Sequence, residues 1–355
     1  MGAIALSPTN IVNNQLTYDK YNTYISMSKY EESPEIMIKR GDVIFVKTGS
    51  TVGKVAYVDK MICKTTLNPQ VVVLKDIKCD NYILSVIMST RNFQNKIQRI
   101  TVGGAVPTLS QVAMGNIFIS LPAAKEQEKI SKFISLLDER ITTQNKIIED
   151  LKKLKSAISK LLFAQKPNGW NRLDTLFSKG KAGGTPTSTN KEYYNGEIPF
   201  LSINDITKQG KYIRYTENHL SQSGLGNSSA WVVPKHSLIL SMYASVGLVT
   251  INEVPLATSQ AMFAMQLKDK DLLGYLYYYL SYFKDRHIHK YIETGTQSNI
   301  NADIVRGIMI PTYGYSHNIE IASTLQSVDA KIENELSVLE QLYRQKGYFL
   351  SRMFI

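Results

Sequence analysis

Apolar residues fall into two long ladders with the same spacing. In each ladder, successive core positions are separated alternately by four and by three residues. This is the a/d pattern of a helix that buries one narrow stripe against another helix. Every rung recurs 191 residues later, and the polar interruptions Gln144 and Lys155 recur as Glu335 and Lys346. The chain therefore contains a duplicated unit built around a long helix. The predicted core rungs are Ile130, Ile134, Leu137, Ile141, Ile148, Leu151, Ile158 and Leu162, and then Ile321, Leu325, Val328, Ile332, Leu339, Leu342, Phe349 and Met353.

The two predicted helices span residues 126–163 and 318–354, and each is about 55 Å long at 1.5 Å per residue. A parallel pairing in register would set Lys155 against Lys346 in the seam, a like-charge contact that costs stability. An antiparallel coiled coil avoids this contact, and we expect it to separate the two globular parts. Packing of each helix on its own globular part, or homodimerisation through the helices, remains open.

Short β-segments punctuated by turn residues fill both globular parts. A helix follows in each copy, and in the second copy it is predicted over residues 272–284. Its tyrosine stripe, Tyr275, Tyr278, Tyr279 and Tyr282, favours core packing over a base-stacking platform. The architecture is therefore a duplicated α/β (α+β) fold. The predicted strands are 42–46, 54–58 and 70–74 in the first copy and 237–241, 248–252 and 261–267 in the second.

Prolines and glycines mark the domain boundaries. Pro122 and Pro311 precede the ladders, where proline indicates a turn or a helix entry, and Pro167-Asn168-Gly169 ends the first helix. The predicted parts are a first globular domain at 1–121, a first long helix at 122–166, a second globular domain at 167–312 and a second long helix at 313–355.

The two globular copies differ at their beginnings. Leu6-Ser7 corresponds to Leu201-Ser202, and Leu74 aligns with Leu267. Residues 170–195 then have no counterpart in the first copy, and this segment carries the glycine-rich turn at residues 183–187. The first domain is therefore expected to be cropped at its N-terminus.

Composition indicates an ordinary folded protein with a polyanionic partner. The 355 residues include 43% hydrophobic and 20% charged residues, and the formal net charge is +11. This excess favours nucleic acid or an acidic membrane surface as a partner. Cys63 and Cys79 offer no disulfide framework and no zinc spacing, which suits a reducing cytosol. The absence of a bilayer-length apolar stretch favours a cytoplasmic protein without a membrane partner.

Candidate catalytic motifs fail on spacing. The run from Gly49 to Lys54 has three residues between its glycines and Val55 after its lysine, so it is not a phosphate-binding loop. His287 and His289 lie two positions apart, which on a helix places them on different faces without a completing ligand. We therefore expect a non-catalytic binding protein with no metal and no cofactor of its own.

The polar loops are the expected binding surface. They occupy residues 47–51 and 103–108 in the first copy and 241–245 and 294–299 in the second. Small residues let backbone N–H groups approach phosphates, and hydroxyl, amide and ammonium groups reach base edges, although each residue also suits an ordinary turn. The candidate DNA-binding residues are Lys47, Thr48, Ser50, Thr51, Lys54, Thr108, Lys181, Thr185, Thr187, Asn204, Lys211, Arg214, Tyr243, Ser245, Thr296, Gln297 and Asn299.

Taken in order, these motifs resemble the specificity subunit of type I restriction-modification enzymes. The motifs are the glycine turn at residues 183–187, the run Tyr193 to Ile206, the strand start Gly41-Asp42-Val43-Ile44, and Leu121-Pro122 followed by the helix entry at residues 126–130. The resemblance covers essentially the whole chain and rests on the order and duplication of the motifs.

The resemblance implies a DNA reader without catalysis. Each recognition domain would read one half of a split DNA sequence, and the helices would set the unread gap. They would also dock two methyltransferase subunits, and restriction subunits would join the complex. S-adenosylmethionine, ATP and Mg would be expected only on those partners. The recognised bases do not follow from the sequence.

The cropped first domain departs from the family pattern. The first recognition domain could be defective, the chain could be a truncated or silent cassette, or a second polypeptide could supply the absent piece. A coiled-coil scaffold that touches no DNA is the rival from another class. Salt distinguishes the two, because a DNA reader loses affinity steeply as salt rises. An enzyme active without partners is a further rival.

Overall fold

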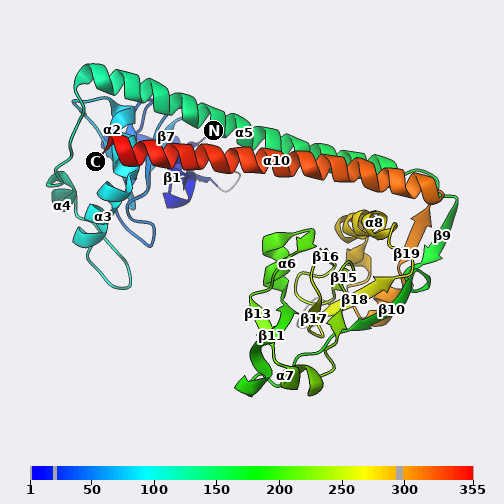
Figure 1. The fold of residues 1–355 in the computed structure, drawn as a ribbon. Coiled ribbons are helices and arrows are strands. Elements are labelled where there is room, and N and C mark those ends of the chain that lie inside the picture. The colour runs from blue at the N-terminus through cyan, green and yellow to red at the C-terminus, as the bar shows by residue number, and fades with distance from the viewer. Residues whose placement is uncertain (1, 19–21, 293–298, 355) are drawn as a thin grey trace. The chain divides into compact units, whose positions relative to one another are not determined.

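The computed structural model describes residues 2–18, 22–292 and 299–354. The chain divides into two compact units (Figure 1). Unit 1 comprises Met1–Lys146 and Leu336–Ile355, and unit 2 comprises Ile147–Glu335. The long helices α5 (Ala124–Phe163) and α10 (Tyr315–Met353) each contribute one segment to both units. Both predicted helices are confirmed within a few residues.

The described residues of unit 1 form two sheets and four short α-helices, in addition to the segments of α5 and α10. A three-stranded sheet has the order β4-β1-β7, and a five-stranded sheet has the order β2-β3-β6-β5-β8. The strands are β1 (Ala3–Leu6), β2 (Ile11–Val12), β3 (Gln15–Leu16), β4 (Thr23–Ile25), β5 (Val43–Val46), β6 (Val55–Tyr57), β7 (Thr65–Leu67) and β8 (Val71–Leu74). The helices are α1 (Met27–Glu31), α2 (Asn81–Ser89), α3 (Arg91–Ile100) and α4 (Gln111–Gly115).

Unit 2 repeats this plan with additional strands. Its sheets have the orders β10-β18-β15-β16-β12, β13-β11-β17-β14 and β19-β9. The strands are β9 (Gly169–Arg172), β10 (Phe177–Ala182), β11 (Tyr194–Leu201), β12 (Tyr212–Ile213), β13 (Asn218–Leu220), β14 (Val232–Val233), β15 (Leu238–Ser241), β16 (Val249–Asn252), β17 (Leu256–Thr258), β18 (Met262–Leu267) and β19 (Met309–Thr312). The helices are α6 (Ile203–Gln209), α7 (Gln222–Gly226), α8 (Leu273–Arg286) and α9 (Ala302–Gly307).

The strand pairings confirm the duplication. Strand β1 runs antiparallel to β4 and parallel to β7, and β11 has the same relations to β13 and β17. The six predicted strands correspond to β5, β6, β8, β15, β16 and β18. These strands could be predicted from the sequence because each is a short apolar run between turn residues.

Two details of the sequence alignment are corrected by the structure. Val43 pairs with Leu74, whereas Leu238 pairs with Met265, so Leu74 corresponds to Met265 and not to Leu267. The reason is that β18 continues for two more residues alongside β10. Pro311 is not at a turn but within β19, opposite Trp170. Among the described residues β19 pairs with β9 alone, and a strand at a sheet edge tolerates a residue without an N–H.

The tyrosines of α8 form part of the main core of unit 2. Tyr275, Tyr278 and Tyr279 are buried, and the hydroxyl of Tyr275 donates to the carbonyl of Pro311. The Phe163 ring at the end of α5 lies edge-on to Tyr279, with centroids 5.4 Å apart. The prediction that this stripe packs in the core is therefore confirmed.

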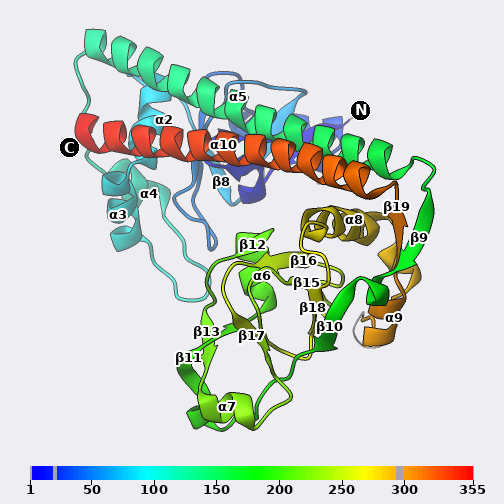
Figure 2. The same ribbon diagram turned by 45° about the vertical axis from the view of Figure 1, so that its right-hand side comes forward.

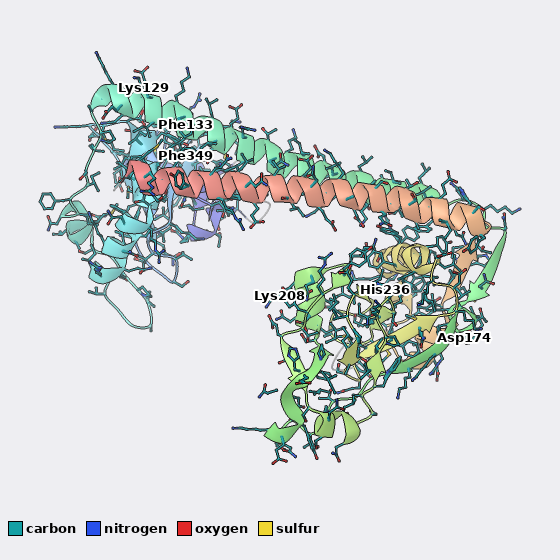
Figure 3. All side chains as sticks on the ribbon, in the orientation of Figure 1. Lys129, Phe133, Asp174, Lys208, His236 and Phe349 are labelled. Carbon is teal, nitrogen blue, oxygen red and sulfur yellow. The ribbon has the colours of Figure 1, made fainter. Side chains whose placement is uncertain are left out.

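The two long helices pair antiparallel in both units. In unit 1 the ring centroids of Phe133 on α5 and Phe349 on α10 lie 4.9 Å apart in an edge-on arrangement, and both residues are labelled in Figure 3. In unit 2 the hydroxyl of Tyr313, just before α10, donates to the carbonyl of Phe163 at the end of α5. All the apolar ladder positions are buried or half-buried. Within each unit, the segments of α5 and α10 run side by side in both views (Figures 1 and 2).

Each unit contains one carboxylate shared between the two helices and the globular part. In unit 1, Lys346 on α10 lies 2.5 Å from Oδ1 of Asp138 on α5, and Tyr82 of α2 donates to Oδ2 at 2.7 Å. Burial and the neighbouring carboxylate raise the pKa of Tyr82, so the phenol keeps its proton and donates. We call this group the unit 1 clamp.

Unit 2 contains the same arrangement with the helix roles exchanged. Lys155 on α5 lies 2.5 Å from Oδ1 of Asp329 on α10, and Tyr278 of α8 donates to Oδ2 at 2.7 Å. Asp138 and Asp329 are separated by the same 191 residues as the ladder rungs. Lys155 and Lys346 would repel each other in a parallel pairing. In the antiparallel pair, each is instead neutralised by an aspartate of the partner helix.

Substitution of Asp138 by alanine should destabilise unit 1 by about 2 kcal/mol, because Lys346 and Tyr82 lose their shared partner in a poorly hydrated position. The free energy of unfolding can be measured with urea and circular dichroism. The exposed pair of Lys153 and Glu149 provides the control, and Lys153→Ala should cost less than about 0.5 kcal/mol. Equal losses for the two variants would contradict the assigned role of the clamp.

Candidate nucleic-acid interface

In unit 2, the loop after β15 meets the segment before α9. Tyr243 forms an isolated β-bridge with Asn299, and the amide of Ile300 donates to the carbonyl of Met242 at 3.0 Å. The tip of the loop is held by a hydrogen bond from the Ser241 hydroxyl to the carbonyl of Ser245. Tyr243 and Ser245 remain exposed, so the loop presents a phenol and a hydroxyl to solvent.

The glycine-rich turn joins this group through the turn between β17 and β18. Gly184 donates its amide to the carbonyl of Thr258 at 2.9 Å, and the Thr185 hydroxyl lies 2.5 Å from the side-chain oxygen of Gln260. The amide of Met242 donates to the carbonyl of Ala261 at 2.7 Å. The glycine-rich turn and the loop after β15, which are far apart in the sequence, thus both contact the turn between β17 and β18.

Glycine is required in the glycine-rich turn for steric reasons. A Cβ atom on Gly183 would lie 1.8 Å from the carbonyl oxygen of Thr258, and one on Gly184 would lie 2.1 Å from the Ser229 hydroxyl. Contacts this short cannot be accommodated without moving backbone. The two glycines therefore bring the turn against β17, which positions Thr185.

Cationic side chains flank the glycine-rich turn along β10. The ammonium groups of Lys179 and Lys181 lie 4.4 and 5.8 Å from the ring of Trp231. Both lysines are exposed, as is Thr187. The aromatic face orients the two ammonium groups while leaving them accessible to an anion.

Unit 1 brings its two predicted loops together in the same way. Thr48 forms an isolated bridge with Thr108, and Gly49 donates its amide to the carbonyl of Pro107 at 2.9 Å. The amide of Lys47 donates to the carbonyl of Gln70 at 2.9 Å. Ser50 is exposed and Thr51 half-buried. Because Thr48 and Thr108 correspond to Tyr243 and Asn299, the convergence is a property of the duplicated fold.

Four candidate residues lie outside these converging groups and are engaged elsewhere. The Lys54 ammonium donates to the carbonyl of Ile11 at 3.2 Å. Asn204 donates to Glu217, and Arg214 pairs with Glu253 at 2.9 Å. Lys211 donates to the Tyr278 hydroxyl at 2.9 Å, and burial lowers the pKa of this lysine. Lys211 therefore extends the clamp of unit 2 instead of joining the converging loops.

Two candidate residues lie outside the described part of the chain, and two contacting residues were not predicted. Thr296 and Gln297 lie outside the described residues. Gln260 and Gln70 were not among the predicted site residues, although the Gln260 side chain contacts Thr185 and the Gln70 carbonyl accepts from the amide of Lys47. Both follow a buried strand at a turn, but nothing in their local pattern distinguishes them from other turn residues.

Within residues 2–18, 22–292 and 299–354, no three histidine, cysteine, aspartate or glutamate side chains are grouped as a metal would require. In the same part of the chain, no helix combines the length and apolar character needed to cross a bilayer. The converging loops themselves present hydroxyl, amide and ammonium groups.

Comparison with known proteins identifies the family. A model of the type I restriction modification DNA specificity domain matches residues 6–153 and again residues 167–343. The chain belongs to this family. The two matches coincide with the two copies of the fold, and each extends from a globular part into the long helix that follows it.

Two relatives of this specificity-domain protein come from Methanocaldococcus jannaschii. The MjaIX specificity subunit is 28% identical over 158 residues, which is 43% of this chain and 36% of that relative. The chain thus matches little more than a third of that relative's length. The putative MjaX specificity subunit is 25% identical over 350 residues, which is 91% of this chain and 80% of that protein.

A solved structure shares the fold. The S subunit of a type I restriction-modification system from M. genitalium superposes with a TM-score of 0.59 at 14% identity, covering 99% of this chain and 92% of that chain. The predicted fold class, two α/β domains with two long antiparallel helices, is therefore confirmed.

Gly183→Ala should destabilise unit 2 of this specificity-domain protein by about 2 kcal/mol, because the new Cβ atom meets the backbone of β17. The thermal midpoint should fall by roughly 4–8 °C, as followed by circular dichroism. Gly226→Ala is the matched control, since nothing lies within 4 Å of its Cβ position. A midpoint unchanged in both variants would show that the turn does not need close approach at this position.

Proposed function

We propose that this chain is the DNA-specificity subunit of a type I restriction-modification complex, and that each unit reads one half of a split DNA sequence. The observation that carries the proposal is the convergence of the same two polar loops in both units, at Thr48 and Thr108 and at Tyr243 and Asn299. A single pair of loops could be structural. The same pair, placed equivalently in two family domains, supports a shared role in recognition.

The chemistry of the loops suits a DNA duplex. Hydroxyl and amide groups hydrogen-bond to base edges in the major groove, while ammonium groups and backbone amides contact phosphates. Lys47 and Lys181 would supply phosphate contacts, and Ser50, Ser245 and Thr187 are exposed enough to reach bases. The net charge of +11 favours the salt-dependent part of the affinity.

The helix pair would act as a spacer between the half-sites. A rod of fixed length converts protein geometry into the spacing of two recognised sequences. In this chain the clamps and the apolar ladders fix the register of α5 against α10. A fixed register would hold the unread gap constant.

We further propose that the chain has no catalytic role. The converging side chains are hydroxyls, amides and ammonium groups, and they lack the acid–base pairs that methyl transfer or hydrolysis would need. Methyltransferase subunits, two in number, would bring S-adenosylmethionine, and restriction subunits would bring ATP and Mg. The chain itself would hold none of these cofactors.

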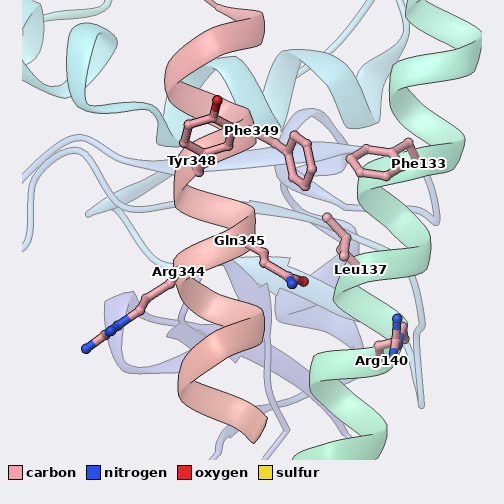
Figure 4. A pocket seen from close by; sticks show the side chains of 7 residues that line it. All are labelled: Phe133, Leu137, Arg140, Arg344, Gln345, Tyr348 and Phe349. Atoms are coloured by element: carbon pink, nitrogen blue, oxygen red, sulfur yellow. The ribbon is translucent and has the colours of Figure 1, made fainter.

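The exposed apolar residues of the long helices are the proposed docking surface for methyltransferase subunits. In unit 2, Ile147, Leu154 and Leu161 recur every seventh residue on α5 and are 40%, 50% and 71% exposed. In unit 1, a hollow between α5 and α10 is lined by Phe133, Leu137 and Phe349 among others (Figure 4). Exposed apolar stripes of this kind mark protein interfaces.

Removal of one matched heptad from each helix should shorten the recognised gap and leave both half-sites unchanged. In unit 1, residues 139–145 and 339–345 lie opposite each other in the register set by the Asp138–Lys346 pair, and their removal shortens each helix by about 10 Å, or about three base pairs. Methylation mapping in cells that express the variant with its methyltransferase subunit measures the outcome.

Removal of residues 139–145 alone is the control, because it breaks the register and should abolish methylation. An altered half-site with an unaltered gap in the double deletion would contradict the spacer role. Loss of the site altogether in an assembled, folded complex would contradict it as well.

Leu154→Glu combined with Leu161→Glu should weaken binding of the methyltransferase subunit by about thirtyfold or more, as expected for a central apolar contact. Isothermal titration with the purified methyltransferase subunit measures this. Lys153→Ala combined with Lys160→Ala changes two exposed side chains on the same helix and should have little effect. Equal weakening by both pairs would place the interface elsewhere.

A further inference from the structure

One residue in the loop after β15 has a strained backbone. Ala244 has a φ of +59°, in the left-handed region, where the Cβ atom of an L-residue crowds the carbonyl oxygen that follows it. Asparagine, aspartate and histidine are the side-chain-bearing types that most often adopt this conformation, and alanine is not one of them. Among the described residues, the other non-glycine residues with a positive φ are all of these three types, namely Asn13, Asn14, Asp76, Asn195 and His236.

The equivalent position in unit 1 is a glycine. Thr48 and Tyr243 form equivalent bridges in the two units, so the residues that follow them, Gly49 and Ala244, are equivalent as well. The φ of Gly49 is +104°, and glycine adopts this conformation without strain. The fold therefore requires a positive φ at this loop position in both copies, and unit 2 meets the requirement with a residue that is strained there.

Hydrogen bonds on the C-terminal side of Ala244 and buried side chains on both sides hold the loop in place. The amide of Val246 donates to the carbonyl of Ala244 at 2.9 Å, and the amide of Gly247 donates to the carbonyl of Ser241 at 2.8 Å. The side chains of Met242 and Val246 are buried in the main core of unit 2. Because the loop is anchored before and after Ala244, this residue keeps its left-handed conformation.

Packing within unit 2 does little to offset the strain. Ala244 is exposed, and so are its two neighbours Tyr243 and Ser245. An exposed methyl group gains little from burial, so a glycine at this position would give a more stable protein. Strained residues that persist in this way cluster at binding sites. The position of Ala244 on the candidate nucleic-acid interface therefore points to a contact with the bound partner.

A DNA duplex has one kind of base-specific apolar group in its major groove, the 5-methyl group of thymine, and alanine side chains are among those that contact it. Tyr243 and Ser245 place hydroxyl groups on either side of the Ala244 methyl group, and hydroxyl groups hydrogen-bond to base edges or phosphates. An apolar group between two polar ones suits a thymine flanked by hydrogen-bonding groups of the duplex.

We propose that Ala244 is a specificity-determining residue of unit 2, and that its methyl group contacts the 5-methyl group of a thymine in the half-site read by this unit. The inference rests on the proposed function, since it requires unit 2 to read bases. Gly49 has no side chain, so the equivalent position of unit 1 makes no such contact. The two units thus share a loop backbone but differ in what this position detects.

Ala244→Gly should raise stability and lower recognition at the same time. Glycine relieves the strain, so the thermal midpoint of unit 2 should rise by roughly 2–4 °C, as followed by circular dichroism. Affinity for the recognised DNA should fall by about fourfold, the value for the loss of one buried methyl group. A residue with a merely structural role would not combine a gain in stability with a loss of affinity.

Replacement of thymine by uracil tests the methyl contact directly, because the two bases differ only in the 5-methyl group. The complex of the full chain with its methyltransferase subunit is titrated with fluorescent duplexes that carry the site found by methylation mapping. Each thymine of the two half-sites is replaced in turn by deoxyuridine, and anisotropy gives the affinity. At one position the replacement should weaken binding of the wild-type complex by about fourfold and leave binding of the Ala244→Gly complex unchanged.

His236→Gly is the matched control. His236, labelled in Figure 3, has a φ of +61° and precedes β15, whereas Ala244 follows this strand. The substitution therefore removes a side chain from a left-handed residue at the opposite end of the same strand. The His236→Gly complex should distinguish thymine from uracil as well as the wild-type complex does.

The inference would be wrong if no uracil replacement distinguished the wild-type complex from the Ala244→Gly complex, and half-sites without any thymine would give this result too. Equal weakening of thymine and uracil duplexes by Ala244→Gly would also overturn it, because the residue would then only position Tyr243. Neither result touches the proposed function as long as the wild-type complex binds its site specifically. Equal affinity of the wild-type complex for the site and a scrambled duplex would overturn the proposed function, and this inference with it.

Discussion

The antiparallel register of the two long helices depends on two shared carboxylates. An a/d ladder alone tolerates a slide by one heptad, because the apolar rungs repeat. A slide in this chain would leave Lys155 and Lys346 without Asp329 and Asp138 in a poorly hydrated seam, which costs far more than the pair itself contributes. The paired charges therefore select one register among several that the apolar residues would accept.

The same carboxylates tie each globular part to the helices of its own unit. Asp138 and Asp329 each use their second oxygen to accept a hydrogen bond from a tyrosine of the globular part. In unit 2, Lys211 adds a further contact to that tyrosine and lies over the rings around it. The orientation of a unit's loops is thus coupled to the helix segment of that unit, and a change of register would strain both.

Local patterns in the sequence predicted the ladders, the duplicated strands and the polar loops, because spacing alone determines which residues share a face. Contacts between distant segments could not be predicted in this way. Thr185 meets Gln260, and Lys211 meets Tyr278, only after several strands have been placed between them. Asp138 and Asp329 are an intermediate case. They lie 191 residues apart, as the ladder positions do, but the sequence does not show that each accepts a hydrogen bond from a tyrosine of the globular part.

The difference between units 1 and 2 shows which strands the two converging loops require and what the glycine-rich turn contributes in unit 2. The described residues of unit 1 lack counterparts of β9 and β10, yet Thr48 and Thr108 still form their bridge. Those strands are therefore not needed to bring the two loops together. What they carry in unit 2 is the turn that places Thr185 beside Gln260 and the lysines beside Trp231. The loop framework of the proposed reading surface thus forms without these strands in unit 1, whereas in unit 2 the positions of Thr185 and of the two lysines depend on them.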